Sequence, residues 1–149
     1  MRRGASPTAG PLGMNLDLIV FRPEEPHQPR INVSSLTQRI DDKRVDVVIR
    51  IELEKGVHLY ASPAPEGFEA LDVEVLAAEG LVVGQPRYPA PTATADGASA
   101  HEDLVQIAIP VILSSAEKPP TLEVQVRYQA CTEAACFPPK VERLVIDVQ

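Results

Sequence analysis

The chain has 149 residues, 44% of them hydrophobic, which predicts one globular domain with a single core. Its formal net charge of −7 argues against a nucleic-acid partner, because contacts with phosphates need clustered Lys and Arg side chains. No apolar run approaches the roughly 20 residues that span a bilayer, so we expect no direct membrane insertion.

The N-terminal residues 1–13 are small and partly basic, and they are predicted to form a linker or a disordered segment. They lack the apolar segment of about 7–15 residues that a secretion signal contains. We therefore expect the folded domain to occupy residues 14–149.

Short alternating or apolar runs predict β-strands along most of this domain. In the clearest run, 45–53, hydrophobic residues fall on one face and charged residues on the other, which is typical of a half-buried antiparallel strand. The predicted strands are 16–21, 45–53, 71–76, 81–86, 105–113, 122–128 and 141–148.

Proline and glycine turn signals separate these runs, and no window of helical length keeps its apolar residues on one stripe. Asp41 and Asp42 are interpreted as turn residues. Fifteen prolines and the absence of Trp also favour short strands and a core of Val, Leu and Ile. The expected fold class is therefore all-β, an immunoglobulin-like antiparallel β-sandwich.

Residues 89–100 are rich in Ala, Thr and Pro, and we expect them to form a mobile surface loop. His27 and His101 lie in predicted loops, where solvated side chains are expected. No functional role is assigned to either histidine.

Both cysteines of the chain, Cys131 and Cys136, lie in one stretch with four small or polar residues between them and Pro138-Pro139 directly after. A disulfide closing so short a loop restrains the unfolded chain by only roughly 2 kcal/mol, which favours redox exchange over a structural role. Exchange needs two sulfurs close together, which requires Cα atoms within about 4.4–6.8 Å, and access for a partner.

No Lys or Arg lies between the cysteines, and Glu133 would disfavour a thiolate there. We therefore hypothesise a pair that does not attack other disulfides promiscuously and that reacts when a docked partner rearranges the site.

The segments 128–131 (YQAC) and 136–139 (CFPP) resemble the thiol motif of the N-terminal periplasmic domain of the thiol:disulfide interchange protein DsbD. The segment 56–60 (GVHLY) is similar to that family's glycine-aromatic-leucine-tyrosine segment, and the resemblance covers roughly residues 15–148. Two departures stand out. Four residues separate the cysteines instead of five, and residues 89–100, at the position of the family's shielding cap loop, contain no aromatic side chain.

The resemblance implies that Cys136 forms mixed disulfides with partners and that Cys131 resolves them. It places His58 and Tyr60 beside the thiols, with Glu133 and Phe137 also lining the site. A histidine at the first of the two aromatic positions departs from the family, and it would provide a proton donor or acceptor near the sulfurs.

The resemblance further implies thiol-disulfide exchange of the protein-disulfide reductase type in the periplasm or another extracytoplasmic compartment. The expected partners are thioredoxin-like or membrane-embedded thiol redox domains and extracytoplasmic disulfide proteins. No cofactor and no metal is expected.

Three other interpretations remain open from the residues alone. The main one is a non-catalytic binding or interaction module in which a structural hairpin disulfide shapes a loop. An oxidant-sensing thiol is the second. A zinc site that uses both cysteines is the third, although the chain lacks the second matching ligand pair that structural zinc usually requires.

Overall fold

The computed structural model describes residues 28–95, 97–114 and 117–148. The strand expected at 16–21, the linker 1–13 and His27 lie outside the described residues, so the predicted boundary at residue 14 stays a prediction. Within the described residues the secondary structure is entirely β, and every strand pairing is antiparallel. The predicted all-β class is confirmed.

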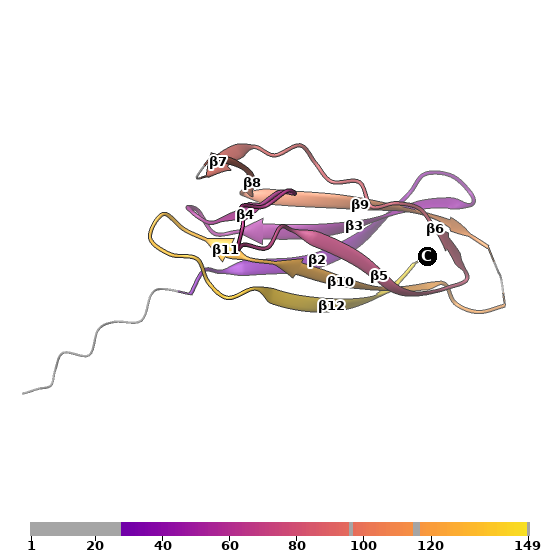
Figure 1. Cartoon of the computed structure of the whole chain (residues 1–149). Coiled ribbons are helices and arrows are strands. Elements are labelled where there is room, and N and C mark those ends of the chain that lie inside the picture. The colour runs from indigo at the N-terminus through magenta and orange to yellow at the C-terminus, as the bar shows by residue number, and fades with distance from the viewer. Residues whose placement is uncertain (1–27, 96, 115–116, 149) are drawn as a thin grey trace, which may run out of the picture.

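Two sheets face each other to form a sandwich (Figure 1). The first sheet has the strand order β2-β3-β9-β6, formed by Ile31–Arg39, Arg44–Leu53, Leu104–Leu113 and Leu81–Val83. The second sheet has the order β12-β10-β5, formed by Lys140–Asp147, Thr121–Tyr128 and Asp72–Glu79.

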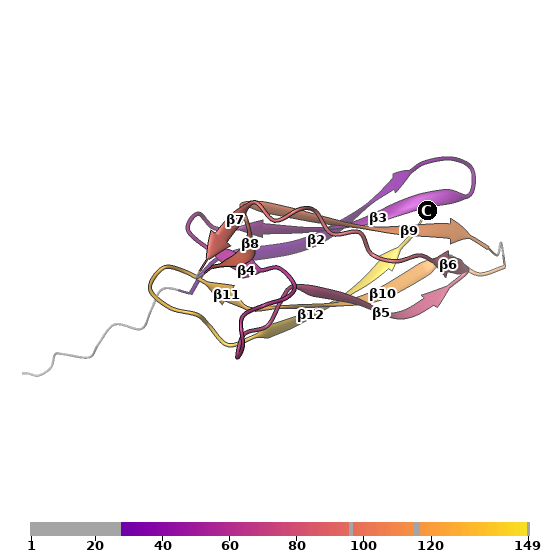
Figure 2. The same cartoon turned by 45° about the horizontal axis from the view of Figure 1, so that its top comes forward.

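A third, smaller sheet lies at one end of the sandwich, as two views of the molecule show (Figures 1 and 2). Its strand order is β11-β4-β8-β7, formed by Ala130–Cys131, His58–Tyr60, Ala98–Glu102 and Ala93–Ala95. Strand β11 is the edge of this sheet and carries Cys131.

The core follows from the alternation in the sequence, because every second residue of a strand points to the same face. In β3 the predicted inward residues are all buried, with alternating buried residues of β9 beside them in the same sheet and alternating buried residues of β10 facing them from the other large sheet. The inward residues of β3 are Val45, Val47, Ile49, Ile51 and Leu53. The described part of the chain contains no helix with the length and hydrophobicity needed to cross a bilayer.

The turn between β2 and β3 confirms the interpretation of Asp41. Its carboxylate accepts hydrogen bonds from the backbone N–H groups of Lys43 and Arg44, at 2.9 and 2.8 Å, and from Nε of Arg44. These bonds, led by the one from Lys43, lower the pKa of Asp41 to about 2.

Residues 89–100 differ from the prediction of an irregular loop. Strands β7 and β8 form a hairpin there, with Gly97 in the left-handed region at φ 80°, and β8 pairs with β4. His101 therefore lies in a strand and is only 4% exposed, so the expectation of a solvated side chain was wrong. Period-two patterning failed here because β7 is short and rich in alanine and threonine.

Candidate functional site

A disulfide bond joins Cys131 and Cys136 across a tight hairpin, with their Cα atoms 4.0 Å apart. The predicted proximity is confirmed, at a distance slightly below the expected interval. The two cysteines form a non-hydrogen-bonded antiparallel pair, in which the flanking residues make the backbone hydrogen bonds. The Cα atoms of opposite residues approach each other most closely in pairs of this kind. The flanking bonds run from Thr132 N to Ala135 O (2.7 Å) and from Phe137 N to Ala130 O (2.9 Å).

The two cysteines differ sharply in exposure. Cys131 is 1% exposed, because β11 packs beside β4 at the end of the sandwich, whereas Cys136 lies outside the sheet edge and is exposed. An attacking thiolate must approach the sulfur in line with the bond that breaks. A partner can therefore reach this disulfide through Cys136.

The side chain of Thr132 holds the tip of the hairpin. Its Oγ1 accepts hydrogen bonds from the backbone N–H groups of Ala134 and Ala135, both at 3.2 Å, and donates to the carbonyl of Ala135 at 3.3 Å. A threonine hydroxyl that bonds the backbone two or three residues ahead stabilises a turn. The exposed Glu133 lies within this turn.

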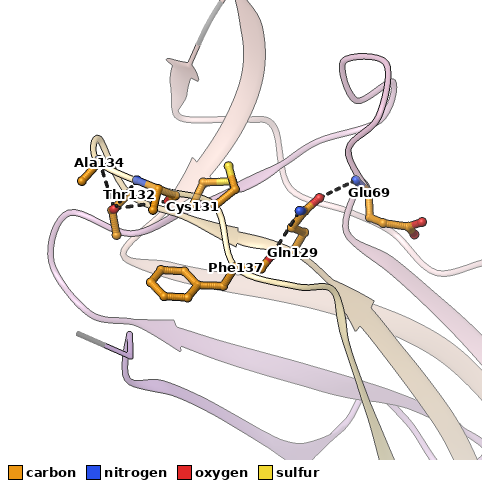
Figure 3. The surroundings of a disulfide bond; sticks show 8 residues. Glu69, Gln129, Cys131, Thr132, Ala134 and Phe137 are labelled. Carbon is orange, nitrogen blue, oxygen red and sulfur yellow. Dashed lines mark hydrogen bonds between the residues drawn. A yellow bond between two sulfur atoms is a disulfide. The ribbon is translucent and has the colours of Figure 1, made fainter. Parts of the chain in front are cut away.

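Gln129 connects the base of the hairpin to a neighbouring loop (Figure 3). Its Nε2 donates to the carbonyl of Phe137 at 3.1 Å, and its Oε1 accepts from the backbone N–H of Glu69 at 2.9 Å. The residue is buried, so its hydrogen bond to Phe137 is largely removed from competition with water, and the bond from Glu69 is partly removed.

Phe137 leaves the hairpin on the side away from the sulfur atoms (Figure 3). Its ring is buried and lines a small cavity of about 80 Å³ together with Tyr128 and Ala130. The hydroxyl of Tyr128 donates to Glu142 at 2.6 Å, and burial together with this carboxylate raises the pKa of Tyr128 above its ordinary value. Phe137 thus anchors the hairpin to the sandwich.

His58 lies directly opposite Cys131 in the pairing of β4 with β11, and opposite Glu102 in the pairing of β4 with β8. Directly opposite residues of an antiparallel pair share one face, with Cβ atoms about 4.5–5.5 Å apart. Nε2 of His58 is buried and has no hydrogen-bond partner among the described residues. The structure thus brings the predicted His58 to the sulfur that is hidden from solvent.

An aromatic cluster continues from His58 along the same face of β4. The ring of Tyr60 meets His58 edge-on, with ring centroids 5.4 Å apart, and meets the tilted ring of Phe68 at the same distance. Tyr60 is fully buried. Phe68 comes from the loop that Gln129 holds through Glu69.

Three contributors to the site were missed in the sequence: Thr132, Gln129 and Phe68. Thr132 had a detectable signal, because a threonine at the start of a four-residue turn commonly bonds the backbone ahead of it. The roles of Gln129 and Phe68 depend on a loop about 60 residues distant, which no local pattern reveals.

Around the site, the described residues contain no group of three or more His, Cys, Asp or Glu side chains that could hold a metal ion. Tyr88, the last aromatic residue before the 89–100 segment, accepts a hydrogen bond from the N–H of Val73 at 2.7 Å. It therefore lies over β5, where it lines a cavity of about 390 Å³ with His101.

A family model described as the N-terminal region of the thiol:disulfide interchange protein DsbD matches residues 27–147 of the chain. The search of curated proteins with the sequence of this chain found no match.

Solved structures share the immunoglobulin-like fold. The reduced DsbD N-terminal domain of Neisseria meningitidis is 22% identical, with a TM-score of 0.50, over 77% of this chain and 83% of that one. The solved complex of the DsbD and PilB N-terminal domains from the same organism matches with 19% sequence identity and a TM-score of 0.52, over 87% of this chain and 88% of that one. The N-terminal periplasmic domain of ScsB from Proteus mirabilis is 16% identical, with a TM-score of 0.53, over 87% of this chain and 49% of that one.

Proposed function

Because the chain belongs to the family of DsbD N-terminal domains, we propose that its Cys131–Cys136 pair relays electrons between thiol proteins by thiol-disulfide exchange. The observation that carries the proposal is the unequal exposure of the two cysteines in one disulfide. A hairpin disulfide that only shaped a loop would not need one sulfur at the surface and the other beneath it.

In the proposed reaction, a partner thiolate attacks Sγ of Cys136, and the bond between Cys136 and Cys131 breaks. An intermolecular disulfide forms at Cys136, and Cys131 leaves as a thiolate that takes up a proton. A second partner thiolate then attacks the partner sulfur of this mixed disulfide and releases Cys136 as a thiolate, which is also protonated. The domain gains two electrons and two protons, and the partner becomes the disulfide.

His58, Tyr60 and Glu133 line the site in this proposal, and Phe137 anchors the hairpin that carries it. The buried Nε2 of His58, opposite Cys131, is available for a proton or a hydrogen bond when the Cys131 thiolate is released. Glu133 in the turn between the two cysteines contributes negative charge to the hairpin, which disfavours a second anion there. This arrangement supports a pair that reacts with docked partners and spares stray oxidants.

The proposed partners are proteins with two cysteines of their own. Thioredoxin-like or membrane-embedded thiol domains would donate electrons, and extracytoplasmic disulfide proteins would accept them. The solved complex between the DsbD and PilB N-terminal domains of Neisseria meningitidis supports a protein as the partner. The periplasmic origin of the ScsB domain supports an extracytoplasmic location.

Reduced thioredoxin added to the oxidised protein tests the proposal. We expect rapid appearance of two free thiols per chain in the wild type, counted with a thiol reagent. With a thioredoxin that keeps only its attacking cysteine, activated as a mixed disulfide with thionitrobenzoate, Cys131→Ser should accumulate a mixed disulfide through Cys136 and release thionitrobenzoate, whereas its matched control, Cys136→Ser, should not. Resistance of the wild-type disulfide to reduction would show that the bond is structural.

A further inference from the structure

Two sets of hydrogen bonds hold the hairpin closed, and neither set involves a sulfur atom. At the tip, Thr132 bonds the backbone of Ala134 and Ala135 through its side chain and bonds Ala135 again through its own N–H. At the base, the N–H of Phe137 donates to Ala130, and Gln129 holds the carbonyl of Phe137. The cysteine pair lies between the two sets, and Figure 3 shows Cys131 between Thr132 and Gln129.

The hydrogen bonds at the tip depend on one side chain, that of Thr132. One hydroxyl oxygen satisfies two backbone N–H groups of a turn whose remaining side chains are a glutamate and two alanines. Alanine has no polar atom that could replace these hydrogen bonds. The conformation of the turn therefore depends on Thr132.

We infer that the hairpin stays closed after its disulfide is reduced, and that Thr132 is the positioning residue that keeps Cys131 within reach of Cys136. The inference rests on the proposed exchange function and adds a residue to it. Holding two reacting groups in place raises their effective concentration, which accelerates ring closure and favours the disulfide at equilibrium.

Thr132 is expected to affect the half of the cycle in which the two thiols are oxidised to the disulfide. The Cys136 thiolate attacks a disulfide reagent, forms a mixed disulfide and releases one thiolate. The Cys131 thiolate then attacks Sγ of Cys136, breaks the mixed disulfide and releases the second thiolate. The chain loses two electrons to the reagent and two protons to the solvent. Thr132 acts on the second step, because the first involves Cys136 alone.

The reduced protein and Ellman's reagent separate these two steps, since each releases one coloured thionitrobenzoate ion. In Thr132→Val, which keeps the side-chain shape and removes the hydroxyl, we expect an unchanged first phase and a second phase about tenfold slower, because the hydrogen bonds of this partly exposed hydroxyl together contribute about a factor of ten. The equilibrium with glutathione should shift by the same factor, which corresponds to a reduction potential about 30 mV higher.

Thr132→Ser keeps the hydroxyl and should restore the second phase. Thr37→Val, in β2 of another sheet, controls for the loss of a threonine hydroxyl as such. Amide hydrogen exchange on the reduced wild type provides a second measurement, with protection expected at Ala134 and Ala135 and its loss expected in Thr132→Val.

Equal second-phase rates in the wild type and Thr132→Val would overturn the inference, and so would unprotected amides in the reduced wild type. These results differ from failure of the proposed function. In that case thioredoxin would not reduce the wild-type disulfide at all, whatever residue 132 is.

Discussion

At the scale of single residues, His58 is the most unusual group near the disulfide. Its Nε2 is buried without a hydrogen-bond partner among the described residues, and burial of an unpaired polar atom costs about 1–3 kcal/mol. The ring also packs edge-on against Tyr60, which any aromatic side chain could do. A histidine retained at such a cost fits a role in the chemistry of Cys131.

Replacing His58 by Phe separates these two contributions. We expect the variant to be more stable by about 1 kcal/mol, a rise in Tm of roughly 2–4 °C, because the unpaired polar atom is removed while the ring contact remains. Reduction by thioredoxin should be slower, because the released Cys131 thiolate loses its neighbouring imidazole. Thermal unfolding and thiol counting measure the two effects.

Unchanged reduction kinetics in a stabilised His58→Phe variant would limit the imidazole to a packing role. A fall in Tm would instead show that Nε2 makes a stabilising contact in solution.

At the scale of elements, the thiol hairpin depends on a loop that is distant in sequence. Gln129 bonds both the hairpin and the backbone of Glu69, and the same loop places Phe68 over Tyr60. The short strands β4 and β11 contribute few ladder bonds of their own. This buried amide is therefore the main polar connection between the loop and the hairpin.

The variant Gln129→Leu tests this connection. It leaves a partly buried N–H of Glu69 and a buried carbonyl of Phe137 without their partner, so we expect a loss of about 2 kcal/mol and a fall in Tm of roughly 4–8 °C. The matched control is Gln125→Leu, on the neighbouring strand β10. Equal Tm values for the two variants would contradict the role assigned to Gln129.

At the scale of the whole molecule, the redox pair lies at the margin of the hydrophobic core. The core cluster fills the space between the two large sheets and reaches Leu59 and Ala130 of the small third sheet, but it includes neither cysteine. The redox state of the pair can therefore change with little effect on the packing that stabilises the fold.

The stability of the whole fold should depend on pH through His101. Burial lowers the pKa of His101 below its ordinary value, and its cavity also contains Asp72 and Tyr88. Below about pH 6.5 the unfolded chain binds more protons at this residue than the folded protein does, so stability present above that pH declines as the pH falls.

Thermal unfolding at pH 7 and pH 5 checks this expectation. We expect Tm of the wild type to decline over this range and His101→Gln to decline less, since the carboxylates titrate alike in both proteins. Parallel declines would exclude His101 as a source of the pH dependence.

The sequence alone was sufficient for most of the long strands and for the cysteine pair. Strands β3, β9 and β10 bury one face, so a period of two appears directly in residues such as Val47, Ile107 and Val124. The two cysteines lie so close along the chain that a local turn brings them together. Strand β2 escaped prediction because Ser34-Ser35 interrupts its alternation, and β4, β7, β8 and β11 are too short to show one.

Tertiary structure decided which cysteine faces the solvent, which side chain lies opposite the buried cysteine and which loop supports the hairpin. Exposure of Cys136 and burial of Cys131 result from the position of β11 at a sheet edge, and the place of His58 results from strand pairing. Local propensity describes each residue with its near neighbours. Pairing and packing join segments far apart in the chain, and they are set by the free energy of the complete fold.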